Sequence, residues 1–420
     1  MLKTITLLPG VTLRCYRDLR FKQSCLSVQL VRQMRREEAA LNALLPAVLL
    51  RGTEAAPELR SITLRLDDLY GASAGSLVRR IGDYQTTGLH CGFIDDRFAL
   101  AGDRILEPML AFLEELLLRP RLEAGAFCRD YVESEKTNLI SAIESRMNNK
   151  QAYANDLMLD SLCREDSYGI PRLGTPEQVA AITAEGLYAH YRVLLEESPV
   201  ELFYVGSGEP ERIAALLTPM FSRFPGSRLP LPPQTPFRPG PPETITKTME
   251  VSQGKLSMGF VTPIDTTDPR FAAMQLCNMV LGGGVTSKLF MNLREKLSLC
   301  YDISSSYHMS KGLLTVSAGI DPENGEKVQA LILRELQACA RGEITPEEAE
   351  AARQALLSSL RGIHDSPGAI EGYYSTAVLS ARGRTPAEYA EALRAVTPEQ
   401  IAEAAATVEL RTVCFLKGVR

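Results

Sequence analysis

The sequence predicts an α+β protein of two homologous domains, each a mostly antiparallel sheet with helices packed to one side. Three observations carry this prediction: the length of the chain, a proline-rich segment near its middle, and strand and helix patterns that occur twice in the same order. A chain of 420 residues is too long for one ordinary domain and fits two domains of about 200 residues each.

The proline-rich segment is PGSRLPLPPQTPFRPGPP, at 225–242. Proline and glycine are so frequent in it that neither a helix nor a central strand is expected. Such a run behaves as a semi-rigid, extended spacer. We therefore predict a first domain at 1–224, a linker at 225–243 and a second domain at 244–420.

Strand patterns recur in the two halves of the chain. SCLSVQLV (24–31) and KLSMGFV (255–261) stand early in each half, and YQTTGLHCGFI (84–94) corresponds to LLTVSAGI (313–320). Strands that come in adjacent pairs, followed by several helices, are typical of α+β domains with antiparallel sheets. The repetition indicates a gene duplication.

Helix patterns recur as well. A long amphipathic helix is predicted after each strand pair, at 105–118 and at 328–339. Thr175, Thr385 and Thr397 each precede a proline, which is the signal of a helix start: a threonine cap followed by proline at the first helical position. A strand pattern then closes each half: VELFYVG (200–206) and LRTVCFLKG (410–418).

Composition excludes several classes of function. Hydrophobic residues make up 45% and charged residues 23% of the chain, and the net charge is −5, as in globular proteins without a basic face for nucleic acid or anionic membranes. No apolar run approaches the roughly 18 residues that span a bilayer, and the N-terminal segment lacks the apolar core of a signal peptide. Nine scattered cysteines without a Cys-x-x-Cys pair predict reduced thiols and a cytoplasmic protein.

The most informative segment is LGGGVTSKLFMNLREKLSLCY, at 281–301. It predicts a glycine-rich turn, an amphipathic helix with Arg294 near its end, and a strand that begins near Tyr301. The glycines do not form a phosphate-binding loop, because the spacing Gly-x-x-x-x-Gly-Lys-Ser/Thr is not met. They predict instead a tight connection that allows close approach of the backbone.

This segment resembles the second domain of the inverted-zincin peptidases, the pitrilysin/insulinase and mitochondrial-processing-peptidase family (M16). The resemblance extends to Arg51-Gly52-Thr53 and to LLLRP at 116–120. It implies a half-clamshell of two domains in which Arg294 and Tyr301 bind the substrate peptide. Leu297 and Ser298 replace the usual Arg-Gly of the family, which we expect to affect the turn between helix and strand.

The metal-binding motif of the family does not match. Active members carry His-x-x-Glu-His, in which two histidines on one helical face bind zinc and the glutamate polarises the metal-bound water. Counting back from Arg51 places Ala43 and Ala47 at the two histidine positions and Pro46 at the glutamate position. The distal ligand position falls near Ala142. Because proline within a helix costs about 3 kcal/mol, we do not expect this region to form a metal-binding helix.

One further departure concerns the first domain. Its usual Asn-Ala-x-Thr edge strand is not recognised near GSLVRRIGDYQ (75–85), so we do not expect a peptide to lie along such a strand.

The sequence predicts neither a separate zinc site nor a cysteine nucleophile. None of the four histidines has another histidine or a cysteine at helical ligand spacing, so a separate zinc site is not predicted: His90, His190, His308 and His364. A cysteine nucleophile is not predicted either. Cys91 and Cys300 lie nearest to the informative segments, but neither stands at a helix N-terminus beside a histidine.

These observations and the resemblance lead to one functional hypothesis. The chain is the non-catalytic, substrate-binding subunit of a heterodimeric zinc-dependent peptidase, inactive alone, with Arg294 and Tyr301 supplied to the cleft. It needs no cofactor of its own, and a His-x-x-Glu-His partner holds the zinc and hydrolyses the peptide. A homodimer of the isolated chain is compatible with this hypothesis. Two alternatives stay open: a non-enzymatic scaffold or peptide-binding protein derived from the peptidase fold, and an autonomous hydrolase that a chelator would inhibit.

Overall fold

The computed structural model describes residues 2–223, 226–251 and 253–418. Residues 224 and 225, where the predicted first domain ends and the linker begins, lie outside the described residues, as do residues 1, 252, 419 and 420. The chain forms two compact units, each assembled from three stretches of the sequence. Unit 1 comprises residues 1–144, 170–234 and 364–376, and unit 2 comprises residues 145–169, 235–363 and 377–420.

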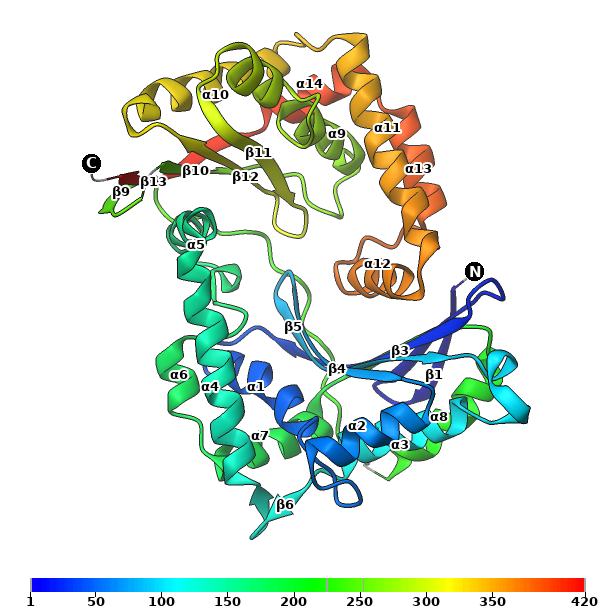
Figure 1. Cartoon of the computed structure of the whole chain (residues 1–420). Coiled ribbons are helices and arrows are strands. Elements are labelled where there is room, and N and C mark those ends of the chain that lie inside the picture. Colours follow the sequence, from blue (N-terminus) through cyan, green and yellow to red (C-terminus); the bar gives the residue numbers. More distant parts are fainter. Residues whose placement is uncertain (1, 224–225, 252, 419–420) are drawn as a thin grey trace. The chain divides into compact units, whose positions relative to one another are not determined.

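The sheet of unit 1 has six strands in the order β1-β2-β8-β3-β5-β4 (Figure 1). All neighbouring strands are antiparallel except β2 and β8, which are parallel. Leu26, Val28 and Leu30 of β3 belong to the hydrophobic core. Ser27 and Gln29 face the other side of the sheet, because successive side chains of a strand alternate. The strands are β1 (Leu2–Leu8), β2 (Val11–Arg17), β3 (Gln23–Gln33), β4 (Ser73–Ile81), β5 (Tyr84–Ile94) and β8 (Val200–Gly206).

The sheet of unit 2 has five strands in the order β11-β12-β10-β13-β9. Only β13 and β9 are parallel, and the other neighbours are antiparallel. Five strands of the unit 1 sheet, in the spatial order β4-β5-β3-β8-β2, correspond one by one to the five strands of unit 2. The single parallel pair also corresponds: β8 with β2 in unit 1, and β13 with β9 in unit 2. The predicted α+β fold with mostly antiparallel sheets is therefore confirmed. The strands are β9 (Glu243–Met249), β10 (Gly254–Val261), β11 (Cys300–His308), β12 (Leu313–Ile320) and β13 (Glu409–Gly418).

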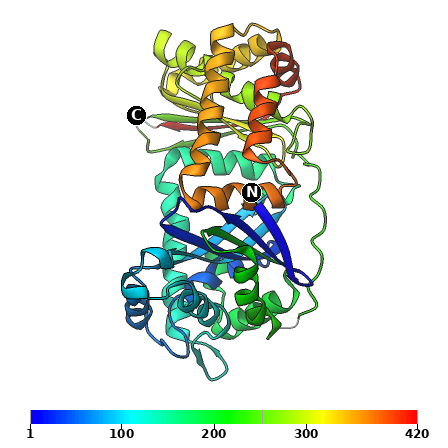
Figure 2. The ribbon, with the colours of Figure 1, turned by 90° about the vertical axis from the view of Figure 1, so that its right-hand side faces the viewer.

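Helices surround both sheets, and α11 and α13 of unit 2 lie side by side (Figure 2). Unit 1 contains α1 (Ala39–Leu49), α2 (Leu59–Asp68), α3 (Leu106–Leu118), α4 (Arg129–Ser145), α6 (Pro176–Ala180), α7 (Ala184–Glu197), α8 (Pro210–Ser222), most of α12 (Pro367–Leu379), and the short hairpin of β6 (Leu122–Glu123) and β7 (Ala126–Phe127). Unit 2 contains α5 (Lys150–Leu162), α9 (Phe271–Leu281), α10 (Gly325–Ala340), α11 (Pro346–Gly362), α13 (Pro386–Ala395) and α14 (Pro398–Ala406). Among the helices described, none is both long and apolar enough to cross a bilayer.

The predicted helix starts are confirmed. Thr175, Thr385 and Thr397 cap α6, α13 and α14, and each forms a reciprocal capping box with the residue three positions later. Thr345 begins α11 in the same way. The cap satisfies backbone N–H groups that have no partner within the helix, which fixes the first residue of each helix.

Helix α12 comes late in the sequence but covers the polar face of the unit 1 sheet (Figure 1). Its Glu371 side chain is only 3% exposed, and its carboxylate forms an ion pair with Arg79 of β4 at 2.7 Å. The same carboxylate accepts hydrogen bonds from Ser27 Oγ at 2.7 Å and from Gln29 Nε2 at 3.0 Å. Arg79 also donates to Ser375 Oγ at 2.8 Å. A buried carboxylate is tolerated only with such partners, so these contacts fix α12 on the sheet.

Helix α5 precedes the proline-rich segment but packs on the sheet of unit 2. Met158 and Leu162 of α5 form a hydrophobic cluster with Leu313 of β12 and with Cys414 and Leu416 of β13. Each sheet is thus covered on one face by a helix from the other half of the sequence. The division at residues 225–243 follows the sequence repeat, but the compact units do not follow it completely. Helix α5 precedes the linker and belongs to unit 2, whereas most of α12 follows the linker and belongs to unit 1.

The described part of the proline-rich segment, residues 226–242, contains no helix or strand. The Gln234 side chain accepts a hydrogen bond from the N–H of Asp83 at 2.7 Å. In unit 2, the buried Lys311 ammonium donates to the carbonyl of Thr235 at 3.0 Å and lies 3.3 Å from the Asp166 carboxylate. A backbone N–H of unit 1 and a side chain of unit 2 therefore hold the segment at defined positions.

Replacing Glu371 with alanine tests the attachment of α12. The change removes the carboxylate that accepts from Ser27, Gln29 and Arg79, and leaves the Arg79 charge without its ion-pair partner. Because Arg79 is 33% exposed, we expect a loss near the lower end for buried ion pairs, about 3 kcal/mol. The loss is measured as a lower urea midpoint of the full chain, followed by circular dichroism. Glu391→Ala is the matched control, since the Glu391 side chain is 76% exposed in its ion pair. Equal midpoints for the two variants would contradict the role of Glu371.

Candidate functional site

Arg294 and Tyr301, the two predicted substrate-binding residues, line the same pocket in unit 2. The pocket has a volume of about 370 Å³. The Arg294 side chain is 41% exposed and Tyr301 is 55% exposed, so both can reach a ligand. The other residues that line it are Glu295, Ser298, Leu299, Cys300 and Asp321.

Arg294 lies in η5 (Phe290–Lys296), a segment with π-helical hydrogen bonding. Its guanidinium stands over the ring of Phe290 at 4.5 Å from the ring centroid. Its Nε is 3.8 Å from the Glu295 carboxylate, which is too long for a hydrogen bond. This cation–π contact orients the guanidinium, whose N–H groups lie in its own plane and point outward from its edge, where a ligand can accept from them.

The turn after η5 depends on Ser298, which has a left-handed backbone with φ of +50°. The N–H of Ser298 donates to the carbonyl of Arg294 at 3.1 Å, and the N–H of Leu299 donates to the carbonyl of Leu293 at 2.9 Å. These bonds close the end of the helix in the manner that usually requires glycine. Serine in place of the family's glycine therefore keeps a left-handed turn, at the cost of backbone strain.

Tyr301 follows this turn at the start of β11. Cys300 pairs with Ile320 and Asp302 pairs with Gly319, so Tyr301 is the extra residue of a β-bulge. Its hydroxyl donates a hydrogen bond to Asp321 Oδ1 at 3.1 Å. That hydrogen bond raises the pKa of Tyr301 above its ordinary value. The bulge and the bond together set the direction of the phenol.

The glycine run contributes a close contact, as the sequence predicts. Gly282 ends α9, and its carbonyl accepts a hydrogen bond from the N–H of Ser305 in β11 at 2.9 Å. A Cβ atom at this position would lie 2.9 Å from the Ser305 nitrogen. Glycine is therefore needed to bring the end of α9 against the strand that carries Tyr301.

The region of the expected metal motif is helical, and the prediction that Pro46 prevents a helix here is wrong. Helix α1 runs from Ala39 to Leu49 with Pro46 inside it. Proline has no N–H to donate to the carbonyl of Asn42, four residues earlier. The hydroxyl of Thr87, on β5, donates to that carbonyl instead, at 2.6 Å. A side chain distant in sequence thus satisfies the group that proline leaves unpaired.

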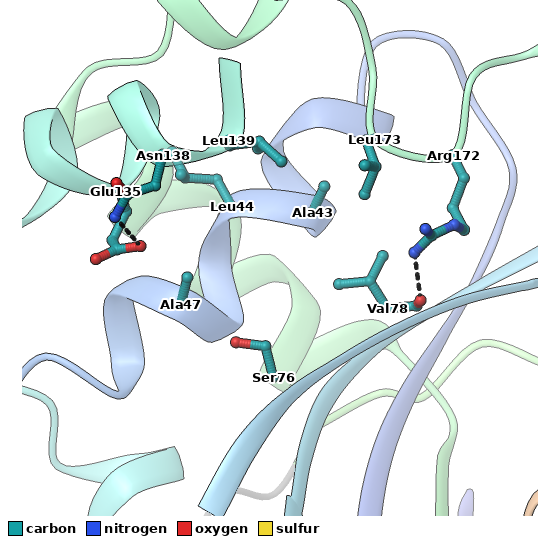
Figure 3. Close-up of a pocket in the computed structure, with 10 residues that line it drawn as sticks. All are labelled: Ala43, Leu44, Ala47, Ser76, Val78, Glu135, Asn138, Leu139, Arg172 and Leu173. Atoms are coloured by element: carbon teal, nitrogen blue, oxygen red, sulfur yellow. Dashed lines mark hydrogen bonds between the residues drawn. The ribbon is translucent and has the colours of Figure 1, made fainter. Parts of the chain in front are cut away.

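Ala43 and Ala47 lie one helical turn apart on α1 and line a pocket of about 350 Å³ in unit 1 (Figure 3). Glu135 and Asn138 of α4 line it as well. Ala142 lies one turn further along the same face of α4 and is exposed. The remaining lining residues are Leu44, Ser76, Val78, Leu139, Arg172 and Leu173.

The residues of this pocket do not fit a zinc ion. Zinc in proteins takes histidine, cysteine and carboxylate ligands, and the alanine side chains provide no ligand atom. The Glu135 carboxylate is engaged with Arg51 at 3.2 Å and accepts from the amide of Asn138 at 3.2 Å. Within residues 2–223, 226–251 and 253–418, no three His, Cys, Asp or Glu side chains gather as a metal site would require.

The structure contains an edge strand where the sequence predicted none. Strand β4 spans Ser73–Ile81 at the edge of the unit 1 sheet, and Ser76 of this strand lines the pocket beside Ala43. The Arg172 guanidinium donates to the Val78 carbonyl of this strand at 2.6 Å. The strand contains no Asn-Ala-x-Thr sequence, so that motif could not reveal it.

The surroundings of Cys91, Cys300 and His190 favour a structural role over a catalytic one. Burial raises the pKa of Cys300 to about 11 and lowers the pKa of His190, which bonds to the Asn42 side chain at 2.7 Å. Burial also raises the pKa of Cys91. Both thiols therefore stay protonated at neutral pH, and a thiol is a weak nucleophile.

Two groups of pocket residues were not identified from the sequence. Ser76 of β4, Asn138 of α4 and Arg172 of the segment before α6 line the same pocket as Ala43 only because the fold brings these distant segments together. Asp321 directly follows β12, and it meets Tyr301 because β11 and β12 are paired. No local sequence signal identifies Asp321, because the pairing of β11 with β12 is a property of the folded sheet.

Comparisons with known proteins agree with these features. Residues 181–356 match the family model described as the Peptidase M16 inactive domain. The probable inactive metalloprotease YmfF of Bacillus subtilis is 29% identical over 411 residues, which cover 97% of this chain and 96% of that protein. The resemblance inferred from the sequence is confirmed.

Solved structures are similar over the full chain. A conserved protein from Enterococcus faecalis has a TM-score of 0.92 and 29% identity, covering 100% of this chain and 99% of that one. A peptidase M16 inactive domain from Pseudomonas fluorescens has a TM-score of 0.83 and 18% identity, covering 100% and 98%, a likeness that concerns the fold alone.

Thr87→Val tests how α1 accommodates Pro46. The valine leaves the buried Asn42 carbonyl without a donor, which should lower the free energy of unfolding by about 1–3 kcal/mol. In a Pro46→Ala background the new N–H can donate to that carbonyl, so the same Thr87 change should cost less. Urea midpoints of the two single variants and the double variant measure the coupling. Strictly additive effects would show that Thr87 does not replace the missing bond.

Ser298→Gly tests the strain in the turn before Tyr301. A left-handed serine costs about 1–2 kcal/mol, and the extra freedom of glycine in the unfolded chain costs about 0.4–1 kcal/mol. We therefore expect the free energy of unfolding to rise by about 0.5–1 kcal/mol. The gain is measured as a higher thermal or urea midpoint. Ser359→Gly, at an exposed position within α11, is the control and should lower stability by about 0.5 kcal/mol. A loss of stability in both variants would contradict the left-handed turn.

Proposed function

We propose that this chain, which is similar to M16 peptidases, is the non-catalytic, substrate-binding subunit of a heterodimeric zinc-dependent peptidase. In this role it binds and orients a peptide through Arg294 and Tyr301. A partner subunit with a His-x-x-Glu-His helix supplies the zinc and the general base. The relative from Bacillus subtilis, whose printed name calls it a probable inactive metalloprotease, is in keeping with a chain that does not hydrolyse by itself.

One observation carries the proposal: the two polar side chains share a pocket, whereas the metal positions hold alanine. Arg294 can donate to a carbonyl oxygen through a planar, charged group, and Tyr301 adds a second polar contact. Ala43 and Ala47 provide nothing that could bind a metal or activate water. Retained binding groups without a hydrolytic group are what a substrate-binding subunit requires.

An extended peptide is the ligand class that the surroundings of the pocket favour. Tyr301 lies at the start of β11, which is an edge strand of its sheet, and β4 beside the other pocket is an edge strand too. Edge strands present backbone N–H and C=O groups with which an extended chain can pair. A small, rigid metabolite would make little use of such a row of groups.

Peptide cleavage by the assembled complex tests the proposal. The chain is combined with a related protein that carries the His-x-x-Glu-His motif, to be sought first in the neighbouring open reading frame, and hydrolysis of a quenched fluorescent peptide is followed. Loss of a charged hydrogen bond costs about 1.5–3 kcal/mol, so Arg294→Ala should lower kcat/KM by about 10- to 100-fold. Arg341→Ala is the matched control, because the Arg341 side chain is 55% exposed at the end of α10.

An unchanged rate in the Arg294 variant, with the complex intact by gel filtration, would contradict the proposed role. It would favour the scaffold, which has no use for this side chain. Hydrolysis by the chain in the absence of the partner would favour the autonomous hydrolase instead.

A further inference from the structure

Asp321 gives the two binding residues opposite hydrogen-bonding roles. An ionised carboxylate accepts hydrogen bonds and cannot donate, so in the 3.1 Å contact with Asp321 Oδ1 the proton comes from the Tyr301 hydroxyl. A phenol has one proton, and once that proton is directed to Asp321 the oxygen can only accept from a ligand.

Arg294 has the complementary capacity. A guanidinium has five N–H donors and no acceptor. The stacking on Phe290 at 4.5 Å and the 3.8 Å separation from Glu295 leave the guanidinium oriented without a short hydrogen bond to that neighbour. The pocket therefore offers a donor from Arg294 and an acceptor from Tyr301, and both residues line it.

A peptide unit has the matching pair of groups, one N–H and one C=O. An oxyanion of a tetrahedral intermediate, in contrast, is stabilised by donors only. An acceptor oxygen beside an oxyanion would be repulsive. The hydrogen-bonding pattern thus distinguishes binding of the intact peptide from stabilisation of the reacting oxygen.

We propose that Asp321 is a positioning residue, which turns the Tyr301 hydroxyl so that Tyr301 accepts an N–H of the bound peptide while Arg294 donates to a peptide carbonyl. This inference rests on the proposed peptide-binding function and deepens it. The pocket then recognises the peptide backbone in its unreacted form. The β-bulge at Tyr301 in β11 and the position of Asp321 directly after β12 fix the geometry, because β11 and β12 are paired.

Ester substitution of single peptide bonds provides the test. A fluorescein-labelled decapeptide, capped at both ends, is selected from a random pool on the wild-type chain, and each peptide bond is replaced in turn by an ester, which lacks the N–H. Fluorescence anisotropy measures binding to the full chain. At one position the ester should weaken binding to the wild type about tenfold.

The same ester should have less than about a threefold effect on Tyr301→Phe, which has no acceptor oxygen. It should have an equally small effect on Asp321→Asn, because the asparagine amide can donate to the phenol oxygen and leave the phenol O–H free to donate to a ligand. Arg294→Ala should weaken the amide and ester peptides alike. Glu326→Gln, at an exposed position of α10, is the control and should behave as the wild type. Equal ester effects in the wild type, Tyr301→Phe and Asp321→Asn would overturn the inference.

A second readout uses the chain without any peptide. With tyrosine labelled at Cζ with carbon-13, the Tyr301 signal should titrate above the ordinary range for tyrosine in the wild type, and should return toward that range in Asp321→Asn. An identical titration in both proteins would overturn the role of Asp321 even if peptides bind. Failure of every peptide in the pool to bind, with the titration difference intact, would instead refute the proposed function, and this inference with it.

Discussion

The buried carboxylate of Glu371 holds together parts of unit 1 that are far apart in the sequence. It receives hydrogen bonds from Ser27 and Gln29 of β3 and pairs with Arg79 of β4. Its own helix, α12, comes almost 300 residues later in the sequence, at Pro367–Leu379. A carboxylate buried in this way must find all its partners, because an unpaired charge in the interior is strongly unfavourable. Unit 1 is therefore complete only when the late helix α12 is in place.

A comparable constraint acts in unit 2, where α5 packs on β10 and β13, and the buried Lys311 pairs with Asp166 just after that helix. The exchange of α5 and α12 means that neither half of the sequence forms its unit alone. It also provides firm frameworks for the two pockets. One pocket lies beside the edge strand β4 and the other beside the edge strand β11.

The two pockets differ in chemistry although the sheets beside them share one topology. The pocket at α1 has methyl groups at Ala43 and Ala47, and its carboxylate, Glu135, is engaged by Arg51. The pocket at η5 has a guanidinium, a phenol and two carboxylates within reach of solvent. Arg294 and Tyr301 have groups that could bind a peptide backbone, whereas Ala43 and Ala47 provide no metal ligand. This difference is the physical basis of the proposal that the chain binds substrate and leaves hydrolysis to a partner.

Much of the fold could be predicted because its signals are local. The strands at 84–94 and 313–320 coincide with β5 and β12, since alternation and turn residues mark both ends. The threonine caps could be predicted for the same reason, because each threonine stands directly before a proline in the sequence. Helix α1 could not be predicted, because the hydroxyl that compensates for Pro46 belongs to Thr87, on another strand. The exchange of α5 and α12 has no local signal at all. For the site, Arg294 and Tyr301 followed from a sequence motif, but Asp321 required knowledge of which strands pair.

The central claim is that this chain has the means to hold a peptide but not the means to cleave it. Metal analysis combined with a cleavage assay tests it most directly, on the purified chain and on its complex with a His-x-x-Glu-His partner. The account predicts no stoichiometric zinc and no cleavage for the chain alone, and one zinc per heterodimer with chelator-sensitive cleavage for the complex. One zinc bound per isolated chain, together with peptide hydrolysis, would contradict it.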